Sequence, residues 1–228
     1  MKNLKTYRQL FENTQELTPE QIEWLDSCTR RGTWTLNPQT GLVDVDGDFN
    51  CSEQGLTDFK GIRFGVVRGY FYCYGNNLTT LEGAPQKGRV SFSCNDNQLT
   101  SLEGAPQEVG PNFNCGHNQL TSLEGAPQRV SGGFYCHNNQ LTSLVGAPQE
   151  VDRDLYCNNN PVSEKTLRRI FSRMKKGKSY IQAVETLWNE IPLEDQVLLY
   201  RPEFEWVSPE ERRKLEAMRA YQGFKGMI

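Results

Sequence analysis

Apolar and polar positions recur at a constant interval through the middle of the chain. The motif F-x-C appears five times and L-x-C once, and these motifs end at Cys51, Cys73, Cys94, Cys115, Cys136 and Cys157. The first two of these cysteines are 22 residues apart, and each later pair is 21 residues apart. Self-similarity at a fixed period of this size predicts a repeat architecture in which every repeat forms one turn of a solenoid.

The order of residues within a repeat predicts which side chains form the core. Phe and Cys stand two positions apart, so both point to one face of a short strand and the residue between them points to the other. In five of the six repeats an Asn follows three residues after the Cys. Parallel stacking then gives inner ladders of Phe and Cys, and an asparagine ladder that bonds the backbone of adjacent turns. The Pro of the G-A-P-Q stretch prevents a helix, so the back of each turn is expected to be extended or turn-like.

The segment before the repeats, residues 1–42, is expected to cap the first turn. Residues 3–14 and 18–31 each have the pattern of a helix, and the second begins with Thr18, a capping residue, followed by Pro at the first helical position. Two strands joined by a turn at residues 37–41 then lead into the first repeat. We therefore predict an N-terminal helical and hairpin cap.

The segment after the repeats, residues 163–228, is expected to be helical. An apolar stripe at i, i+3, i+4 and i+7 predicts a helix that closes the last repeat; it consists of Leu167, Ile170, Phe171 and Met174. Further helices are predicted over 181–191, from Pro192, and from Ser208 to about Tyr221. This is more chain than a cap requires, so the segment is either a cap or a small helical domain with its own role.

Composition and charge narrow the class of protein. Hydrophobic residues make up 36% of the 228 residues and the formal net charge is −3, so there is no overall electrostatic case for nucleic acid or an anionic membrane. No apolar run approaches the roughly 18 residues of a membrane span. The first residues lack the apolar core of a signal peptide. We therefore expect no membrane association, a cytoplasmic location and reduced cysteines.

Neither the cysteines nor the histidines form a pattern typical of a metal site or an active site. One Cys per turn places a row of thiols in the core, without the paired spacing of a tetrahedral site. The chain has two histidines, His117 and His137, which do not share a register and have no evident acid–base partner. No nucleophile-elbow, phosphate-loop or zinc-protease motif occurs. We expect no metal, no cofactor and no enzymatic activity.

The stretch F-S-C-N-D-N-Q-L-T-S-L, residues 92–102, resembles the L-x-L-x-x-N-x-L signature of leucine-rich repeats. It is most similar to the short bacterial variety, whose units have about 20 residues. The form with E-G-A-P and F-x-C resembles repeat proteins encoded by tailed bacteriophages and their hosts. The resemblance covers residues 43–162. It implies an α+β fold: a six-strand leucine-rich-repeat parallel-β solenoid with an N-terminal helical cap and a C-terminal helical region.

The resemblance also carries expectations about function. A phage-encoded repeat protein would act in the cytoplasm of an infected bacterium, for example by inhibiting a host defence component. Some bacterial effectors with similar repeats carry a C-terminal ubiquitin-ligase domain with a Cys nucleophile. Here no Cys follows Cys157, which belongs to the last repeat, so the resemblance does not extend to that activity.

The exposed, concave face of the predicted sheet is the expected binding surface. Its columns lie three residues before, one before and one after each Cys. We expect the partner-binding residues to be Tyr70, Tyr72, Tyr74, Asn95, Asn114, Tyr135, His137 and Tyr156. Tyr and Asn supply rigid contact area and adaptable hydrogen bonds, as they do in paratopes. Alternatively, the tyrosines only stack against neighbours across strands. Because Lys and Arg are absent from the columns, a protein partner is favoured over a phosphate backbone.

The first helix after the repeats carries the main alternative. Its candidate basic patch is Lys165, Arg168, Arg169 and Arg173, with further lysines after it. Such a patch would suit nucleic acid or an acidic partner. The solvated face of a helix packed on a solenoid is the favoured interpretation, because such a face is often charged and no aromatic residues are interleaved with the basic ones. A structural or assembly protein, which would self-associate, is a third alternative.

Overall fold

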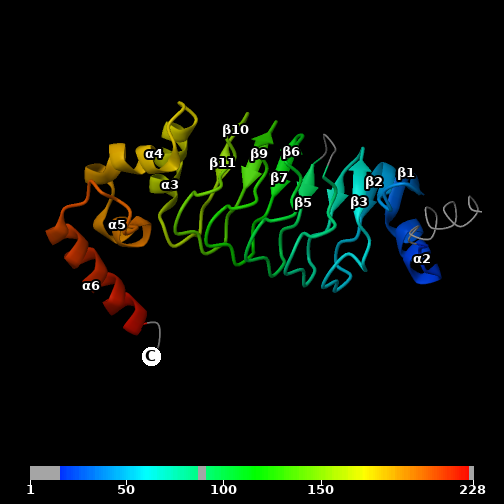
Figure 1. Cartoon of the computed structure of the whole chain (residues 1–228), viewed down its shortest axis with the longest axis horizontal. Helices are drawn as coiled ribbons and strands as arrows, with labels where there is room; N and C mark the ends of the chain where they lie inside the picture. Colours follow the sequence, from blue (N-terminus) through cyan, green and yellow to red (C-terminus); the bar gives the residue numbers. More distant parts are fainter. Residues whose placement is uncertain (1–15, 87–90, 226–228) are drawn as a thin grey trace, which may run out of the picture.

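The repeats form a parallel β-solenoid of about five turns, with a spacing of about 21 residues. The structure is a computed structural model that describes residues 16–86 and 91–225. Across these residues the main sheet contains six parallel strands that follow one another along the solenoid (Figure 1): β2 (Val43–Asn50), β4 (Phe71–Tyr72), β5 (Phe92–Ser93), β7 (Asn112–Asn114), β9 (Gly133–Tyr135) and β11 (Leu155–Tyr156). The predicted α+β class and parallel solenoid with flanking helices are confirmed.

Equivalent residues of successive turns lie directly beside one another. Phe71 pairs with Phe92, and Phe92 with Phe113, in the register of adjacent strands. Their rings stack at centroid distances of 5.3 and 5.5 Å with nearly parallel planes, and they are buried. The predicted inner ladder of Phe is therefore present, and it supplies most of the bulk of the core.

The cysteines form a second buried ladder beside the phenylalanines. The Cys115 thiol, for example, lies 3.3 Å from the carbonyl oxygen of Tyr135 on the next turn and donates to it. All seven cysteines are free and buried. Cys28, which lies outside the repeats, is near enough to Cys51 to act on its pKa, and its Sγ accepts from the Nε2 atom of Gln54 at 3.3 Å. The sequence period does not reveal this seventh member.

The asparagine ladder ties each turn to its neighbours. The Nδ2 atom of Asn118 donates to the carbonyl oxygens of Cys94 and Cys115, at 3.1 and 3.2 Å, and its Oδ1 atom accepts from the backbone N–H of Leu99 at 2.9 Å. Asn97 and Asn139 repeat these bonds one turn on either side. Because the amides satisfy backbone groups that no strand pairing reaches, this predicted ladder holds the turns in register.

The back of the solenoid is extended, as the proline of the G-A-P-Q stretches predicts. Three short parallel strands form a second sheet: β6 (Glu108–Val109), β8 (Arg129–Val130) and β10 (Glu150–Val151). The core also contains buried leucines from the L-T-S-L stretches, including Leu102, Leu123 and Leu144.

The N-terminal cap consists of α2 (Pro19–Cys28) and β1 (Thr29–Leu36), which pairs antiparallel with β2. A further strand, β3 (Phe64–Val67), also pairs with β2. The helix expected over 18–31 extends three residues too far at its C-terminal end, because Thr29 already pairs with Phe49. The helix expected over 3–14 lies outside the described residues.

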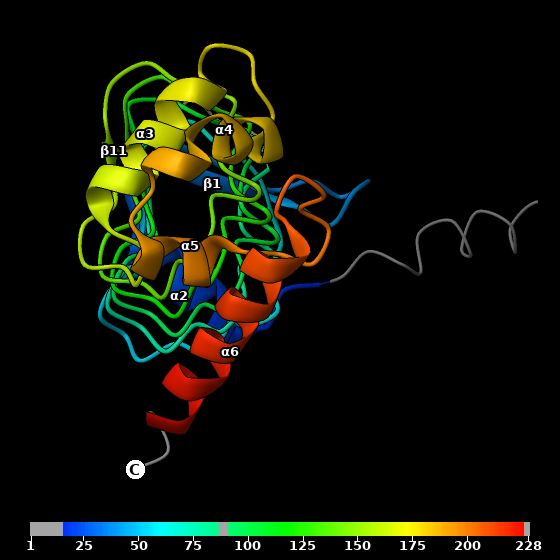
Figure 2. The ribbon, with the colours of Figure 1, turned by 90° about the vertical axis from the view of Figure 1, so that its left-hand side faces the viewer.

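The C-terminal segment contains α3 (Glu164–Met174), α4 (Tyr180–Leu187), a 3-10 turn η1 (Trp188–Glu190), α5 (Leu193–Leu199) and α6 (Pro209–Lys225). The predicted stripe of α3 covers the last turn: Leu167, Ile170 and Phe171 are buried. Seen along the solenoid, α3, α4 and α5 lie over its end, and α6 extends away from them (Figure 2). No helix within the described residues has the length and apolar character that crossing a bilayer requires.

Candidate functional site

The outer face of the main sheet carries the residues that stand between each Phe and Cys. These residues alternate with the buried ladders, so their side chains emerge on the opposite side of the strands. Along the solenoid this column reads Asn50, Tyr72, Ser93, Asn114, Tyr135 and Tyr156, and each of them is half-buried. Two tyrosine groups therefore flank two short polar residues on one face, which we call the outer sheet face.

The first tyrosine group comes from one turn. The rings of Tyr70 and Tyr72 stack with 5.4 Å between centroids and 5° between planes, and Tyr74 lies 6.2 Å from Tyr72. The backbone N–H of Tyr70 donates to the Asp48 carboxylate at 2.8 Å. Burial raises the pKa of Tyr72 above its ordinary 10.0, and the nearby Tyr70, Asp48 and Tyr74 raise it further. These contacts place a carboxylate beside the aromatic group.

The second tyrosine group spans two turns. Tyr135 and Tyr156 stack with 4.5 Å between ring centroids and 2° between planes. The guanidinium of Arg168, from α3, lies over the Tyr156 ring at 5.8 Å from its centroid. The Nε atom of Arg168 also donates to Glu164 at 2.8 Å. The C-terminal cap thus contributes a cation to this stack, a contact between two segments that sequence patterns treat as unrelated.

A hollow separates the two tyrosine groups. Its volume is about 270 Å³, and its lining is Tyr72, Ser91, Phe92, Ser93, Asn112, Asn114 and Tyr135. The Oδ1 atoms of Asn112 and Asn114 accept from the backbone N–H groups of Gly133 and Gly116, both at 3.0 Å. These bonds orient the amides. Their Nδ2 atoms have no hydrogen-bond partner among the described residues, so they remain available as donors.

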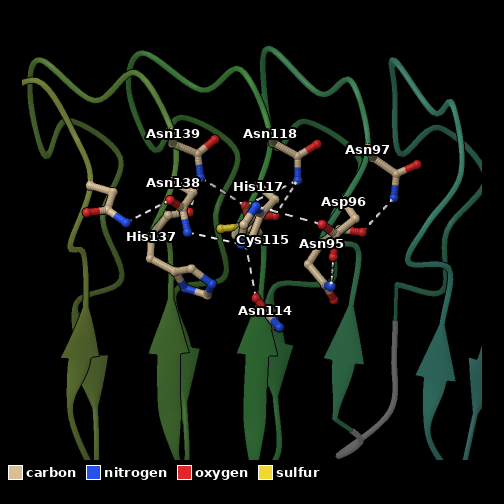
Figure 3. Close-up of polar contacts among 12 residues, drawn as sticks. Asn95, Asp96, Asn97, Asn114, Cys115, His117, Asn118, His137, Asn138 and Asn139 are labelled. Atoms are coloured by element: carbon tan, nitrogen blue, oxygen red, sulfur yellow. Dashed lines mark hydrogen bonds and ion pairs between the residues drawn. The ribbon is translucent and has the colours of Figure 1, made fainter.

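A row of polar side chains borders the outer sheet face beyond the ends of the strands (Figure 3). Its members stand two residues after a Cys and have left-handed backbone: Asp96, His117, Asn138 and Asn159. Asn159 donates to Asn138 Oδ1 at 2.9 Å, and Asn138 Nδ2 lies 3.0 Å from His117 Nε2. Because the oxygen of Asn138 is already an acceptor, its amide donates to Nε2, which assigns the proton of neutral His117 to Nδ1.

The two histidines have partners that the sequence analysis did not identify. His117 Nδ1 lies 3.8 Å from the carboxylate of Asp96, within the range of an ion pair but longer than a hydrogen bond. His137 meets His117 edge to face, with 5.2 Å between ring centroids. Burial and the neighbouring His117 lower the pKa of His137, against the opposing effect of Asp96. A shared register, two residues after a Cys, was the sequence signal that could have linked Asp96 to His117.

The residues of the candidate basic patch are partly engaged within the protein. Arg168 contacts Glu164 and Tyr156, and Arg169 forms an ion pair with Glu190. Beyond the patch, Lys175 donates to the carbonyl oxygen of Val151 at 2.6 Å. Lys165 is exposed and Arg173 is half-buried. The basic side chains of α3 therefore do not form one open cluster.

Comparisons with known proteins identify no relative: no family model, no curated protein and no solved structure matches the chain. Within the described residues, no group of three or more His, Cys, Asp or Glu side chains is arranged to hold a metal ion. The chemistry of the outer sheet face is therefore the basis for inferring function.

Proposed function

We propose that this protein is a leucine-rich-repeat solenoid that binds another protein through its outer sheet face and catalyses no reaction. One observation carries the proposal: two tyrosine stacks face a polar hollow on a surface whose columns, all within the described residues, contain no Lys or Arg. Tyrosines offer large, rigid contact area at low cost in conformational entropy. The core does not require them, because the Phe and Cys ladders already fill it.

The assignment to leucine-rich repeats is supported by the Asn position of the signature. In this chain that Asn bonds the backbone of two turns, which is the role a conserved amide needs in a thin solenoid. The spacing of about 21 residues and the parallel sheet agree with the same class.

The proposed setting rests on the resemblance alone. The E-G-A-P and F-x-C form suggests a phage-encoded protein in the host cytoplasm, with a host protein such as a defence component as its target. The target would be inhibited by occupation of its surface, since no chemistry is assigned to the solenoid.

A protein partner is favoured over nucleic acid for two physical reasons. Binding to a phosphate backbone depends on several cationic side chains acting together. On α3, Arg168 and Arg169 are each held by a carboxylate. On the outer sheet face, the Asp48 carboxylate accepts from the backbone N–H of Tyr70, and the columns offer no Lys or Arg to a phosphate.

The test is affinity capture from bacterial lysate, with the full chain as bait. The wild type is compared with a variant carrying Tyr72→Ala, Tyr74→Ala and Tyr135→Ala, and nuclease is added in parallel. We expect a protein that the wild type retains and the variant does not. A matched control replaces exposed acids of the back edge, Glu82→Ala, Glu103→Ala and Glu124→Ala, and should retain the partner.

Thermal melts of all three proteins show whether each bait is folded. If a partner is captured equally by wild type and tyrosine variant, the outer sheet face is not the binding surface. If capture disappears with nuclease and survives the tyrosine changes, the protein is a nucleic-acid-associated one.

A further inference from the structure

In the column of the outer sheet face, two positions between tyrosines carry short polar residues in place of aromatic ones. Tyr156 and Tyr135 stack on adjacent strands, and Tyr72 stands three strands beyond Tyr135. At the usual strand separation, Tyr72 and Tyr135 are anchored roughly 14 Å apart. The two positions between them are Ser93 and Asn114, whose short side chains leave the hollow open. A planar group entering there would continue the stack.

The structure already shows which planar group this stack accepts. On the far side of the second tyrosine group, the guanidinium of Arg168 lies over the Tyr156 ring. Tyr135 stands on the opposite side of that group and forms a wall of the hollow. Because an aromatic ring is negative on both faces, it attracts a cation from either side.

The charges around the outer sheet face favour a cation as well. Asp48, Asp96 and Asp154 lie along it or at its border, and its columns contribute no Lys or Arg. Arg31, which lies outside the columns, forms an exposed ion pair with Asp48 at 3.9 Å. Asp48 is near enough to raise the pKa of Tyr72, and Asp154 near enough to act on Arg168. Because the columns carry no Lys or Arg, and an exposed ion pair such as that of Asp48 contributes little, a positively charged side chain suits this face better than a phosphate or a carboxylate.

We propose that the hollow between Tyr72 and Tyr135 receives an arginine side chain of the partner protein, stacked on the inner face of Tyr135. This inference rests on the proposed function and specifies the chemistry of the partner. Arginine is preferred over lysine because its planar guanidinium stacks on aromatic faces and donates from several N–H groups. Ser91 and Ser93, which line the hollow, offer hydroxyl oxygens as acceptors.

The remaining polar groups suit the peptide that carries the arginine. The Nδ2 atoms of Asn112 and Asn114 have no partner among the described residues, so they can donate to main-chain carbonyl oxygens of an extended segment. The volume of about 270 Å³ is just below the range of 300–1,000 Å³ typical of small-molecule pockets. One inserted side chain matches this size better than a cofactor does.

The test is an NMR titration of the full-length, nitrogen-15-labelled chain with short blocked peptides. The probe is Gly-Ser-Arg-Ser-Gly, and the comparator carries citrulline, which keeps the planar shape but removes the charge. We expect shifts of the amides of Ser93, Asn114 and Tyr135, and roughly threefold to tenfold weaker binding of the citrulline peptide. Tyr135→Leu should weaken arginine binding similarly, whereas Tyr135→Phe, which keeps the ring, should preserve it.

Equal binding of the arginine and citrulline peptides would overturn the inference, and so would shifts located away from the hollow or no shifts at millimolar peptide. The result is independent of the capture experiment. If capture depends on the tyrosines but the hollow shows no preference for arginine, protein binding stands and this inference fails. If the hollow prefers arginine but capture ignores the tyrosines, the hollow's chemistry stands and the proposed function of this face fails.

Discussion

Arg168 lies over the ring of Tyr156, with its guanidinium carbon 5.8 Å from the ring centroid. This contact joins the helix that follows the repeats to the outer sheet face. It also changes how Arg168 is interpreted: the residue belongs to the border of the tyrosine surface, where Glu164 holds it in place. Arg168, which the sequence suggested as part of a nucleic-acid-binding patch, thus packs on an aromatic stack.

Removing this contact should affect stability only slightly. Arg168→Ala is expected to lower the free energy of unfolding by about 1 kcal/mol, because an exposed i,i+4 ion pair contributes a few tenths and a surface cation–π contact about 0.5–1 kcal/mol. Urea unfolding measures the change. Lys165→Ala, which removes a charge from the same helix, serves as control; a loss of several kcal/mol for Arg168→Ala would mean that the residue closes the core.

The asparagine ladder should be far more sensitive. Asn118→Ala removes a buried amide that bonds Cys94, Cys115 and Leu99, and it leaves those backbone groups without partners. We expect a loss of about 1–3 kcal/mol in the free energy of unfolding. The control is Gln119→Ala, a change at the next, exposed position. Equal effects of the two substitutions would contradict the structural role of the ladder.

Substitutions at two glycines with nearly the same φ distinguish the cost of a strained backbone from the cost of a steric clash. Gly125 and Gly177 have φ of 84° and 85°. A Cβ atom on Gly125 would lie 2.3 Å from the backbone N of Glu103, whereas one on Gly177 would meet nothing within 4 Å. Gly177→Ala should therefore cost about 1 kcal/mol, the penalty of left-handed backbone, and Gly125→Ala clearly more. Thermal unfolding of both variants shows which substitution costs more stability. A larger loss for Gly177→Ala would contradict the close approach of Gly125 to the backbone of the neighbouring turn.

The cysteine ladder should make the fold sensitive to alkali. Burial raises the pKa of Cys115 and Cys136 well above the ordinary value of 9.0. Above about pH 9 the unfolded chain releases these protons while the folded chain retains them. Stability then falls with rising pH, by about 1.4 kcal/mol per pH unit for each such thiol.

The measurement is the urea midpoint between pH 7 and 10. Cys115→Ala should make the fall of the unfolding free energy with pH shallower at alkaline pH, by the contribution of one thiol. At neutral pH the dependence on pH should be unchanged. A midpoint that stays constant up to pH 10 would show that the thiols are exposed to water in the folded state.

The repeat region could be predicted because its contacts are periodic. Phe92 contacts Phe71 and Phe113, which occupy the equivalent position in the two adjacent repeats. Asn118 bonds Cys94, the repeat cysteine of the preceding turn. In a solenoid a sequence offset of one period becomes a neighbour in space. The core ladders, the asparagine ladder and the alternation that turns Tyr72 outward all follow from that rule.

Contacts between the flanks and the solenoid could not be predicted, because no period relates their residues. Cys28 joins the cysteine cluster and Arg168 covers Tyr156 only because α2 and α3 approach the two ends at particular angles. The helix expected over 18–31 ended at Cys28 for the same reason: pairing of Thr29 with Phe49 outweighed local helical preference.

The sequence by itself determined the solenoid, its ladders and the set of outward-facing tyrosines, because these depend on local alternation and on a constant repeat. Only the tertiary structure decided how those side chains combine: the separation of two tyrosine groups by a hollow, the cation at one end of the stack and the polar row from Asp96 to Asn159. Such relations depend on ring orientation, side-chain length and the path of the flanking helices, which a one-dimensional pattern does not encode.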